Sequence, residues 1–366
     1  MNQILLVPLT VLLLLAVSST VQSCLPSERA ALLAFKSSLQ ESDVGVFNSW
    51  TGTNCCQNWF GVACDQNSRQ VAIIDLRAGT LYATMEKAHR PGYMTGHISP
   101  EICKLTRLSS IIITDWKAIS GEIPHCITSL TYLRIIDLAG NRISGTLPSN
   151  IGMLKQLMLL SVADNLITGN IPATLPSVAG LTHLDLRNNQ ITGPIPQWLG
   201  RLKILSRVLL SGNKISGPIP SSISSMSRLV DLDLSMNKLS GPIPESLGRM
   251  AVLGMLKLDM NKLSGSIPAT LLVSGITELN LSHNYLEGDI PDSFGARSYF
   301  TSMDLSYNNL KGPLPKSISS ASYIGYIDLS HNHLCGSIPS YSGLENMDQS
   351  SFANNDCLCG KPLKAC

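Results

Sequence analysis

The sequence predicts an α/β solenoid: a right-handed superhelix of short coils with a concave parallel β-sheet and a disulfide-bonded cap at each end. Three observations lead to this prediction. An asparagine recurs at nearly constant spacing, leucines and isoleucines recur in a fixed pattern around it, and cysteines gather near both ends of the chain. Such a period indicates a repeat architecture, because one coil can bury its apolar side only against its neighbours.

The repeat is nearly constant in length. Two apolar residues separated by one position precede each asparagine, as Ile136 and Leu138 precede Asn141. This alternation predicts a short strand with inward apolar side chains, so that stacked coils form a parallel sheet at about 4.8 Å spacing. We expect each asparagine amide to bond backbone groups of the turn that would otherwise be buried without partners. The asparagines follow at steps of 24 residues, with one step of 23: Asn141, Asn165, Asn189, Asn213, Asn237, Asn261, Asn284, Asn308 and Asn332.

The second half of each coil carries a Gly-x-Ile-Pro pattern, as at residues 241–244. Proline fixes its own φ and favours an extended residue before it, so this half is predicted to be extended. Two segments depart from the repeat. Trp116 and Lys117 stand where an asparagine is expected, and residues 78–93 interrupt a first coil whose strand is predicted at 71–76. This insertion must leave the solenoid as a loop, either a tolerated irregularity or a binding loop.

Residues 1–23 have the composition of a secretory signal peptide. They contain no charged side chain, are apolar from Ile4 to Val17 and end in the small-residue pattern Val21-Gln22-Ser23. A membrane anchor is the alternative, but an apolar core of about 14 residues is shorter than the ~20 that a spanning helix needs. We therefore expect a protein secreted to the extracellular space or cell wall, without a membrane span.

The cysteines indicate an oxidising compartment, because all ten follow the predicted signal peptide. Cys103 and Cys126 are about one coil apart, which predicts a disulfide between neighbouring coils, with two packed free thiols as the alternative. The other cysteines form the two end groups, and the sequence alone does not give their connectivity. A zinc site is the competing interpretation, but the spacings fit no metal pattern. The end groups are Cys24, Cys55, Cys56 and Cys64, and Cys335, Cys357, Cys359 and Cys366.

These features divide the chain into four segments. In the N-terminal cap, Ser27 is predicted to cap a helix in which Leu32, Phe35 and Leu39 share one face. The predicted segments are a signal peptide (1–23), an N-terminal cysteine cap (24–70), about ten repeats with the insertion (71–334) and a C-terminal cysteine cap (335–366).

Charge and motifs exclude several classes of function. The formal net charge is +2, and basic residues are scattered among acidic ones, so the sequence lacks the basic face that nucleic-acid binding requires. No phosphate loop, metalloprotease motif, nucleophile elbow or kinase signature is present. We expect a monomer that is not an enzyme, uses no cofactor or metal, and binds a protein partner.

Outward positions of the concave strands carry the recognition information, because the core fixes the inward ones. The candidate contact residues are outward aromatic, methionine, charged and apolar side chains, most of which break the repeat consensus. Asp231 and Asp233 share a strand face, as glycosidase carboxylates do, but a regular repeat favours a surface role for them. The candidates are His183, Arg187, Arg207, Leu209, Asp231, Asp233, Met236, Met255, Lys257, Met260, Tyr307 and Tyr326.

One outward column is mostly acidic and would suit a basic partner, although Leu-Asp-Leu-Ser is also the ordinary consensus here. Asn280-Leu281-Ser282 in this column is the only N-glycosylation sequon, so Asn280 is a predicted glycan site on a concave strand. The column consists of Asp137, Ser161, Asp185, Leu209, Asp233, Lys257, Asn280, Asp304 and Asp328.

Three segments, Ser49 to Cys56, Ala88 to Ser99 and Cys357 to Cys366, carry a family resemblance. They resemble a plant group named DNA-damage-repair/toleration leucine-rich-repeat proteins, and the chain is also similar to the related polygalacturonase-inhibiting proteins. The resemblance implies the plant-type superhelix, with a second short sheet beside the concave one. It also implies the cap disulfides Cys24 with Cys55, Cys56 with Cys64, Cys335 with Cys357, and Cys359 with Cys366.

Four functional hypotheses follow from the resemblance and from the residues themselves. Polygalacturonase-inhibiting proteins bind fungal pectinases, so the leading expectation is a secreted, non-catalytic protein-binding scaffold of the defence type, with a secreted glycosidase as partner. The alternative is an extracellular ligand-sensing partner of a receptor kinase, which would bind a receptor ectodomain. DNA-damage repair or toleration follows from the group name, but the export signal, the disulfides and the near-neutral charge oppose it. A fourth hypothesis is an ice- or carbohydrate-binding surface built on the column Ser144, Thr168, Thr192, Ser216, Ser240 and Ser264.

Overall fold

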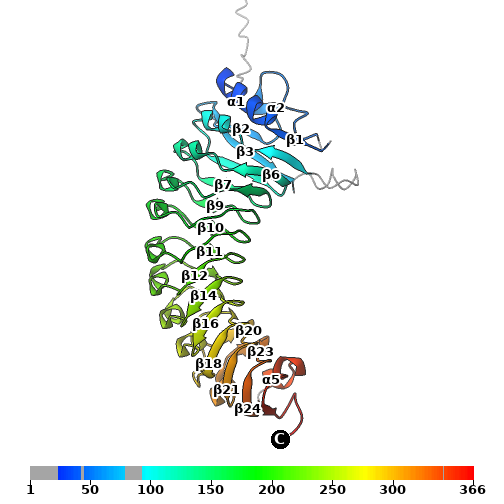
Figure 1. Cartoon of the computed structure of the whole chain (residues 1–366), viewed down its shortest axis with the longest axis vertical. Coiled ribbons are helices and arrows are strands. Elements are labelled where there is room, and N and C mark those ends of the chain that lie inside the picture. Colours follow the sequence, from blue (N-terminus) through cyan, green and yellow to red (C-terminus); the bar gives the residue numbers. More distant parts are fainter. Residues whose placement is uncertain (1–23, 43–44, 79–92, 341) are drawn as a thin grey trace, which may run out of the picture.

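The computed structural model describes residues 24–42, 45–78, 93–340 and 342–366. The predicted signal peptide and residues 79–92 of the insertion lie outside this part of the chain. Coils stack from the N-terminal cap to the C-terminal cap along a curved axis, so that the molecule forms an arc (Figure 1). The predicted fold class, a solenoid with a concave parallel sheet, is confirmed.

The concave sheet runs the length of the described chain and takes one strand from each coil. Its strands pair in parallel, except that β2 of the cap is antiparallel to β3. The strands, in spatial order, are β2 (Val62–Cys64), β3 (Val71–Arg77), β5 (Ser110–Thr114), β7 (Ile135–Asp137), β9 (Leu159–Ser161), β10 (His183–Asp185), β11 (Arg207–Leu209), β13 (Asp231–Asp233), β15 (Met255–Lys257), β17 (Glu278–Asn280), β20 (Ser302–Asp304) and β23 (Ile327–Asp328).

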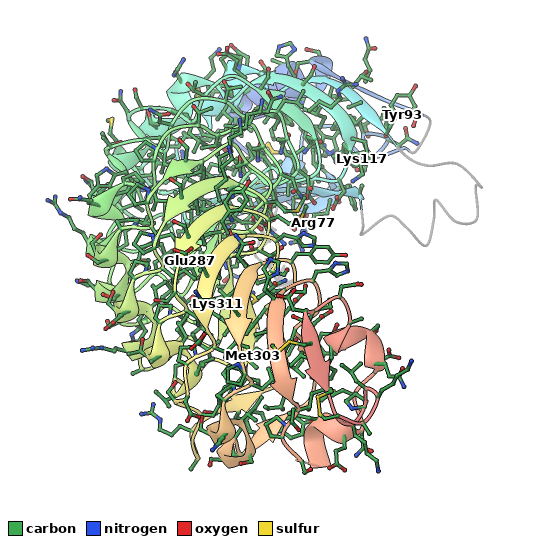
Figure 2. The ribbon with its side chains drawn as sticks, turned by 60° about the horizontal axis from the view of Figure 1, so that its bottom comes forward. Arg77, Tyr93, Lys117, Glu287, Met303 and Lys311 are labelled. Carbon is green, nitrogen blue, oxygen red and sulfur yellow. A yellow bond between two sulfur atoms is a disulfide. The ribbon has the colours of Figure 1, made fainter. Side chains whose placement is uncertain are left out.

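A second set of short strands lies beside the concave sheet, where the Gly-x-Ile-Pro half of each coil begins. It forms two runs, separated at the coils near Thr168 and Thr192, where strands give way to a single bridge from Thr146 to Thr168. Figure 2 shows Glu287 and Lys311 on neighbouring strands of the later run. The first run is β1 (Leu39–Glu41), β4 (Met94–His97), β6 (Lys117–Glu122) and β8 (Arg142–Ser144), and the later run is β12 (Ser216–Gly217), β14 (Lys238–Gly241), β16 (Lys262–Gly265), β18 (Tyr285–Asp289), β21 (Asn309–Gly312), β24 (His333–Ser337) and β25 (Cys357–Cys359).

Short helices return each coil along the outer side of the arc (Figure 1). Another small sheet, β19 (Tyr299–Phe300) with β22 (Tyr323–Ile324), precedes the last concave strands. Among the described residues no helix is long and apolar enough to cross a membrane. The outer helices are η2 (Pro100–Lys104), η3 (His125–Ser129), η4 (Ile151–Met153), η5 (Leu175–Ser177), η6 (Gln197–Arg201), η7 (Ser221–Ser225), η8 (Glu245–Arg249), α4 (Ala269–Leu272) and η9 (Lys316–Ser320).

The asparagine ladder joins consecutive coils inside the solenoid. Asn213 is buried, and its Nδ2 donates to the carbonyls of Leu186 at 2.9 Å, Leu210 at 3.0 Å and Ser211 at 3.3 Å, while its Oδ1 accepts from the Ile191 amide at 3.0 Å. The amide therefore satisfies backbone groups of its own coil and of the preceding one, as the sequence predicts. Each such group would cost about 1–3 kcal/mol if it were buried without a partner.

Trp116 replaces the missing asparagine of the irregular coil. Its ring is fully buried, and its Nε1 donates to the carbonyl of Leu76 at 2.7 Å. The equivalent bond in the next coil runs from Asn141 Nδ2 to the Ile113 carbonyl at 2.8 Å. An indole has a donor but no acceptor, so this substitution retains only the donor half of the ladder function.

Disulfides hold both caps and one pair of neighbouring coils. The cap bonds join the pairs that the family resemblance implies, and a further bond joins Cys103 to Cys126 across 23 residues. The ladder continues into the C-terminal cap, where Asn355 Nδ2 donates to the Leu329 carbonyl at 3.0 Å. The cap disulfides are Cys24–Cys55, Cys56–Cys64, Cys335–Cys357 and Cys359–Cys366.

The N-terminal cap covers the first coil with a helix and an aromatic cluster. Helix α1 (Pro26–Ser37) buries Leu32 and Phe35. The short α2 (Cys55–Asn58) lies between Trp50 and Trp59 in the sequence, and the rings of these two tryptophans stack 5.1 Å apart. The prediction that Ser27 is the N-cap residue of this helix is wrong, because the helix begins at Pro26 and Ser27 lies inside its first turn. Proline suits that position, since its missing N–H would have no helical partner there. At the other end α5 (Ser342–Glu345) and η10 (Gln349–Phe352) cover the last coil.

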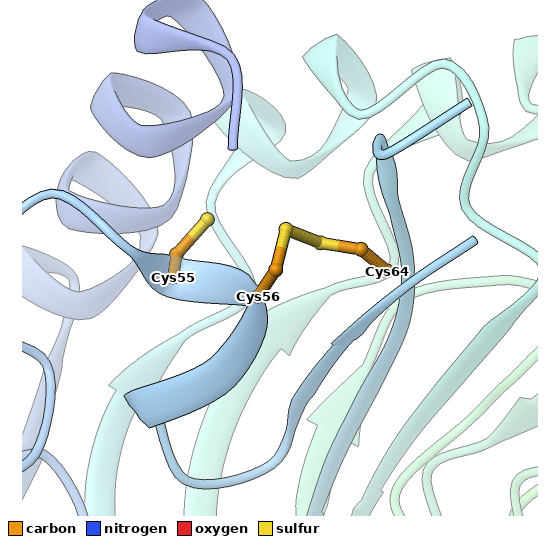
Figure 3. Close-up of side chains that lie close together, drawn as sticks. All are labelled: Cys55, Cys56 and Cys64. Carbon is orange, nitrogen blue, oxygen red and sulfur yellow. A yellow bond between two sulfur atoms is a disulfide. The ribbon is translucent and has the colours of Figure 1, made fainter. Parts of the chain in front are cut away.

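The only cluster of candidate metal ligands among the described residues consists of Cys55, Cys56 and Cys64. Figure 3 shows Cys56 bonded to Cys64, with Cys55 beside them. Cys55 is bonded to Cys24. A disulfide sulfur is not the thiolate that zinc requires, so this cluster is part of the cap framework.

The ladder can be tested with two neighbouring asparagines. Asn308 is buried and makes the ladder bonds, whereas the next residue, Asn309, is exposed on β21. We expect Asn308→Ala to lower the free energy of unfolding by about 3 kcal/mol, because it leaves buried backbone groups unpaired. Asn309→Ala should stay within about 0.5 kcal/mol of the parent. Urea denaturation measures both, and equal effects would contradict the ladder's role.

The Cys103–Cys126 disulfide can be tested by replacing both cysteines with serine. The bond closes a loop of 23 residues, for which restriction of the unfolded chain gives about 3 kcal/mol. We expect the double variant to lose stability of this size while its far-ultraviolet circular dichroism remains unchanged. An unchanged urea midpoint would show that neighbouring-coil contacts alone hold this region.

Candidate functional site

The concave face presents its outward side chains in regular columns. The strand register places His183, Arg207, Asp231 and Met255 side by side on successive strands. A second column runs parallel to it, two residues further along each strand, from Asp185 through Leu209, Asp233 and Lys257. Seven of the twelve predicted contact residues therefore form two adjacent rows.

Charges in the middle of the concave face are mostly paired with one another. Arg207 Nε lies 2.7 Å from an Asp231 carboxylate oxygen, and Lys257 Nζ lies 2.6 Å from a Glu278 oxygen. Arg187 pairs with Asp185 of its own coil at 2.7 Å. Exposed ion pairs contribute little stability. They do mean that neither a purely acidic nor a purely basic partner is favoured here.

The acidic column has a structural role. In Asp233 the Oδ1 atom accepts a hydrogen bond from the backbone amide of Ser235 at 3.1 Å and one from its hydroxyl at 2.7 Å. Asp304 holds Ser306 in the same way. The aspartate thus shapes the turn after each strand, which supports the consensus interpretation over a site for a basic partner.

Asn280 takes the place of an aspartate in this column. Its Oδ1 accepts from the Ser282 amide at 3.0 Å and hydroxyl at 2.8 Å. The side chain is half-buried on β17, between Lys257 and Asp304. A glycan there remains a prediction, and it would cover the C-terminal half of the concave face.

Burial changes the protonation of several groups on this face. Burial raises the pKa of Asp259 to about 6, with Asp233 and Asp304 adding to the effect. Burial also raises the pKa of Asp137 and lowers that of His183. Protonation of Asp259 therefore makes the concave face less negative as the pH falls through about 6.

A ridge borders the concave sheet at the C-terminal ends of its strands. We define it as the five residues that directly precede the consecutive ladder asparagines from Asn237 to Asn332, all with φ between 52° and 56°. Side chains rarely adopt this left-handed conformation. Met236 and Met260 are about half exposed, and the Tyr307 ring stacks between those of His283, at 4.1 Å, and His331, at 3.9 Å. The ridge thus consists of Met236, Met260, His283, Tyr307 and His331.

The predicted contact residues do not form one compact patch. The two rows lie on β10 to β15, Arg187 follows β10, and Met236 and Met260 stand beside the rows on the ridge. Tyr307 and Tyr326 lie several coils further along, and Tyr326 is exposed with its hydroxyl bonded to Asp328 at 3.2 Å. The structure thus separates them into a central group and a C-terminal aromatic group.

Sequence reasoning missed an apolar area at the N-terminal end of the concave face. Ile73, Ile135 and Leu159 occupy the same outward column as His183, and Met158 lies beside them. Ile73 and Met158 are 36% and 38% exposed, so this area is open to solvent. The signal was available, because apolar residues stand at outward positions of the repeat there. Figure 2 shows the side chains inside the arc, with Arg77 of β3 among them.

The serine and threonine column follows the second set of strands and crosses the gap between its two runs at Thr168 and Thr192. Hydroxyls of Ser144, Thr168 and Thr192 donate to backbone carbonyls of the preceding coil at 2.9–3.3 Å. These hydroxyls therefore stabilise coil stacking.

The fold and this surface define an extracellular-type binding scaffold: a disulfide-capped solenoid with an open concave face. Models of known protein families match the N-terminal cap and coils described above. Residues 25–65 match the leucine rich repeat N-terminal domain, and residues 131–191, 155–215, 205–226, 228–250 and 274–334 match leucine rich repeats. The chain belongs to the plant leucine-rich-repeat proteins.

Among curated proteins, the chain is 51% identical over 129 residues to DNA damage-repair/toleration protein DRT100 of Arabidopsis thaliana. The aligned region is 35% of this chain and 35% of that protein, so the chain spans about a third of that relative.

Two solved structures extend the likeness. A plant ice-binding protein is 26% identical with a TM-score of 0.69, covering 94% of this chain and 99% of that one. The plant peptide hormone receptor RGFR1 in complex with RGF2 is 34% identical with a TM-score of 0.66, covering 70% of this chain and 41% of that one.

The Asp259 carboxyl gives the folded protein a testable pH dependence. Its pKa in the folded state is higher than in the unfolded chain, so the folded protein binds the proton more tightly. The contribution of the Asp259 carboxyl to the free energy of unfolding is fully present below about pH 4 and is lost as the pH rises through about 6. We expect Asp259→Asn to be more stable than the parent by about 1 kcal/mol at pH 7, after allowance for partial exposure, and equal to it at pH 4.

The matched control is Asp289→Asn, whose side chain is exposed on β18. Thermal unfolding of the parent and both variants across pH 4–7 measures the offsets. An offset from Asp259→Asn that is constant would contradict the effect of burial on Asp259.

Proposed function

We propose that this protein is a secreted, non-catalytic scaffold that binds a polypeptide partner along its concave face. The observation that carries the proposal is the exposed ridge of methionine and aromatic side chains beside rows of paired charges. Methionine and aromatic side chains are enriched in protein interfaces, and charged groups in an interface set register and specificity more than affinity.

The partner belongs to one of two classes on this proposal. A secreted glycosidase would make the protein an inhibitor-like defence protein of the plant cell wall. A peptide or a receptor ectodomain would make it a ligand-sensing partner of a receptor kinase. The likeness to a peptide hormone receptor in complex with RGF2 supports the second class more than the first.

Two other functions can be weighed against the same surface. DNA-damage toleration is suggested by the name of DRT100, but the central concave cations are paired with carboxylates, which leaves little charge for a phosphate backbone. Ice binding is suggested by a structural neighbour. In the serine and threonine column, the hydroxyls that donate to backbone carbonyls are already bonded within the protein, which opposes this function.

The proposal can be tested with the secreted, disulfide-intact protein as bait for plant apoplastic and fungal culture proteins. The ridge variant is Met236→Asn/Met260→Asn/Tyr307→Asn, because asparagine tolerates the left-handed backbone. We expect it to weaken partner binding at least about tenfold by surface plasmon resonance, since it removes apolar contact area.

Met153→Asn is the control, because Met153 is 51% exposed on η4, at the outer side of the arc. It should leave binding unchanged. The partner's identity then separates inhibitor from receptor partner. Equal binding by the ridge variant and the parent would place recognition outside the ridge, and binding of DNA that falls steeply with salt would favour the toleration hypothesis.

A further inference from the structure

A trough crosses the N-terminal end of the concave face, and we define it by two adjoining hollows that share Ser109 and Arg134. The first, of about 510 Å³, is lined by polar and charged side chains that include Asp65, Arg107 and Tyr132. The second, of about 490 Å³, is lined largely by the apolar area already described, with Ile135 and Leu159. A charged end thus continues directly into an apolar end.

The charged end holds two arginines that differ from those elsewhere on the concave face. Arg187 and Arg207 each pair with a carboxylate within 2.7 Å. Within the described ranges, no carboxylate lies at ion-pair distance from Arg107 or Arg134. Asp65 shares the hollow and attracts Arg107 from beyond ion-pair distance, while its Oδ1 accepts bonds from the Ser68 amide and hydroxyl of its own turn. The two guanidinium groups therefore retain donors for an external anion.

Both arginines are held in place by neighbours that do not neutralise them. The Arg107 guanidinium lies over the Tyr132 ring, 4.5 Å from its centroid. The Arg134 Nη2 donates to the Met158 sulfur at 3.3 Å. Stacking on a ring fixes the plane of a guanidinium while its edge stays free for bidentate bonds to a carboxylate. Arg134 also forms the boundary between the two hollows, so an anion bound there lies next to the apolar end.

We propose that the trough binds an extended acidic segment of a partner polypeptide, with carboxylates at Arg107 and Arg134 and an adjacent apolar side chain between Ile135 and Leu159. This inference deepens the proposed function and rests on it. The charge of the two arginines calls for an acidic ligand, and the apolar end calls for a hydrophobic group close to it. An extended chain fits better than a small molecule, because the two hollows adjoin one another and both are open to solvent.

The trough also lies far from the predicted glycan site. Its central strands are β5, β7 and β9, whereas the predicted glycan site is on β17, five strands beyond β9. At about 4.8 Å per strand, this places Asn280 more than ~20 Å away. A glycan at Asn280 would leave the trough accessible.

The test uses fluorescein-labelled synthetic peptides in which two glutamates precede Leu-Phe across glycine spacers of increasing length. Two matched sets replace the glutamates by glutamine, or Leu-Phe by Ser-Ser. We expect the acidic apolar peptides to bind the full secreted protein by fluorescence anisotropy, and the affinity to fall as salt screens the charges. Each matched set should bind at least about tenfold more weakly. Equal binding of the glutamate and glutamine peptides would overturn the proposal.

Variants locate the binding on the protein. Arg107→Gln/Arg134→Gln should weaken binding of the acidic apolar peptides at least about tenfold, which matches the loss of charge-assisted hydrogen bonds. Leu159→Ser should weaken binding of the same peptides but not of the Ser-Ser set. The control is Arg228→Gln, because Arg228 is exposed and occupies the same coil position as Arg107 five coils further along. Retained binding in the double variant would place the peptide elsewhere and refute the trough.

The same variants separate this inference from the proposed function. A natural partner that is lost with the ridge variant but retained with Arg107→Gln/Arg134→Gln would sustain the proposed function and refute its extension to the trough. Loss with both variants supports both. Retention with both would refute both.

Discussion

The asparagine side chains that join consecutive coils are the interaction on which the rest of the structure depends. Each coil turns sharply after a three-residue strand, so the turn buries amides and carbonyls that the strand ladder cannot satisfy. Asn213 shows how one side chain meets this need, because it bonds carbonyls of two coils and an amide of the earlier one. The concave columns are regular because the donor bonds of this connection recur in every coil from Asn141 to Asn355.

Much of the fold could be predicted from the sequence, because its determinants are periodic and local. The recurring asparagine and the Leu-x-Leu pattern give the coil, the strand and the inward face, and the 23-residue spacing of Cys103 and Cys126 places them on neighbouring coils. The predicted start of α1 was wrong, because both Pro26 and Ser27 suit a helix N-terminus and the choice between them depends on how the cap packs. The ladder role of Trp116 could not be seen, because an indole in place of an amide breaks the pattern that carried the prediction.

The candidate site was less predictable, because side-chain partners are not periodic. The sequence identifies Arg207 and Lys257 as unusual outward residues, but only the structure shows that Asp231 and Glu278 neutralise them. It also shows that the aspartate column shapes turns, so that its charge follows from the turn chemistry and not from a partner. Conversely, Ile135 and Leu159 stand at outward positions of the repeat, so the sequence carried a signal for this apolar area, and the strand register confirms their outward column.

The ladder also bears on the thermodynamics of recognition. Every contact column is fixed to the backbone of a three-residue strand, and that strand is tied on both sides by sheet bonds and by an asparagine amide. The backbone under a partner that spans several coils consequently has little conformational entropy left to lose on binding. The ordering cost then falls mainly on the partner, so a flexible partner would bind more weakly than a rigid one that makes the same contacts.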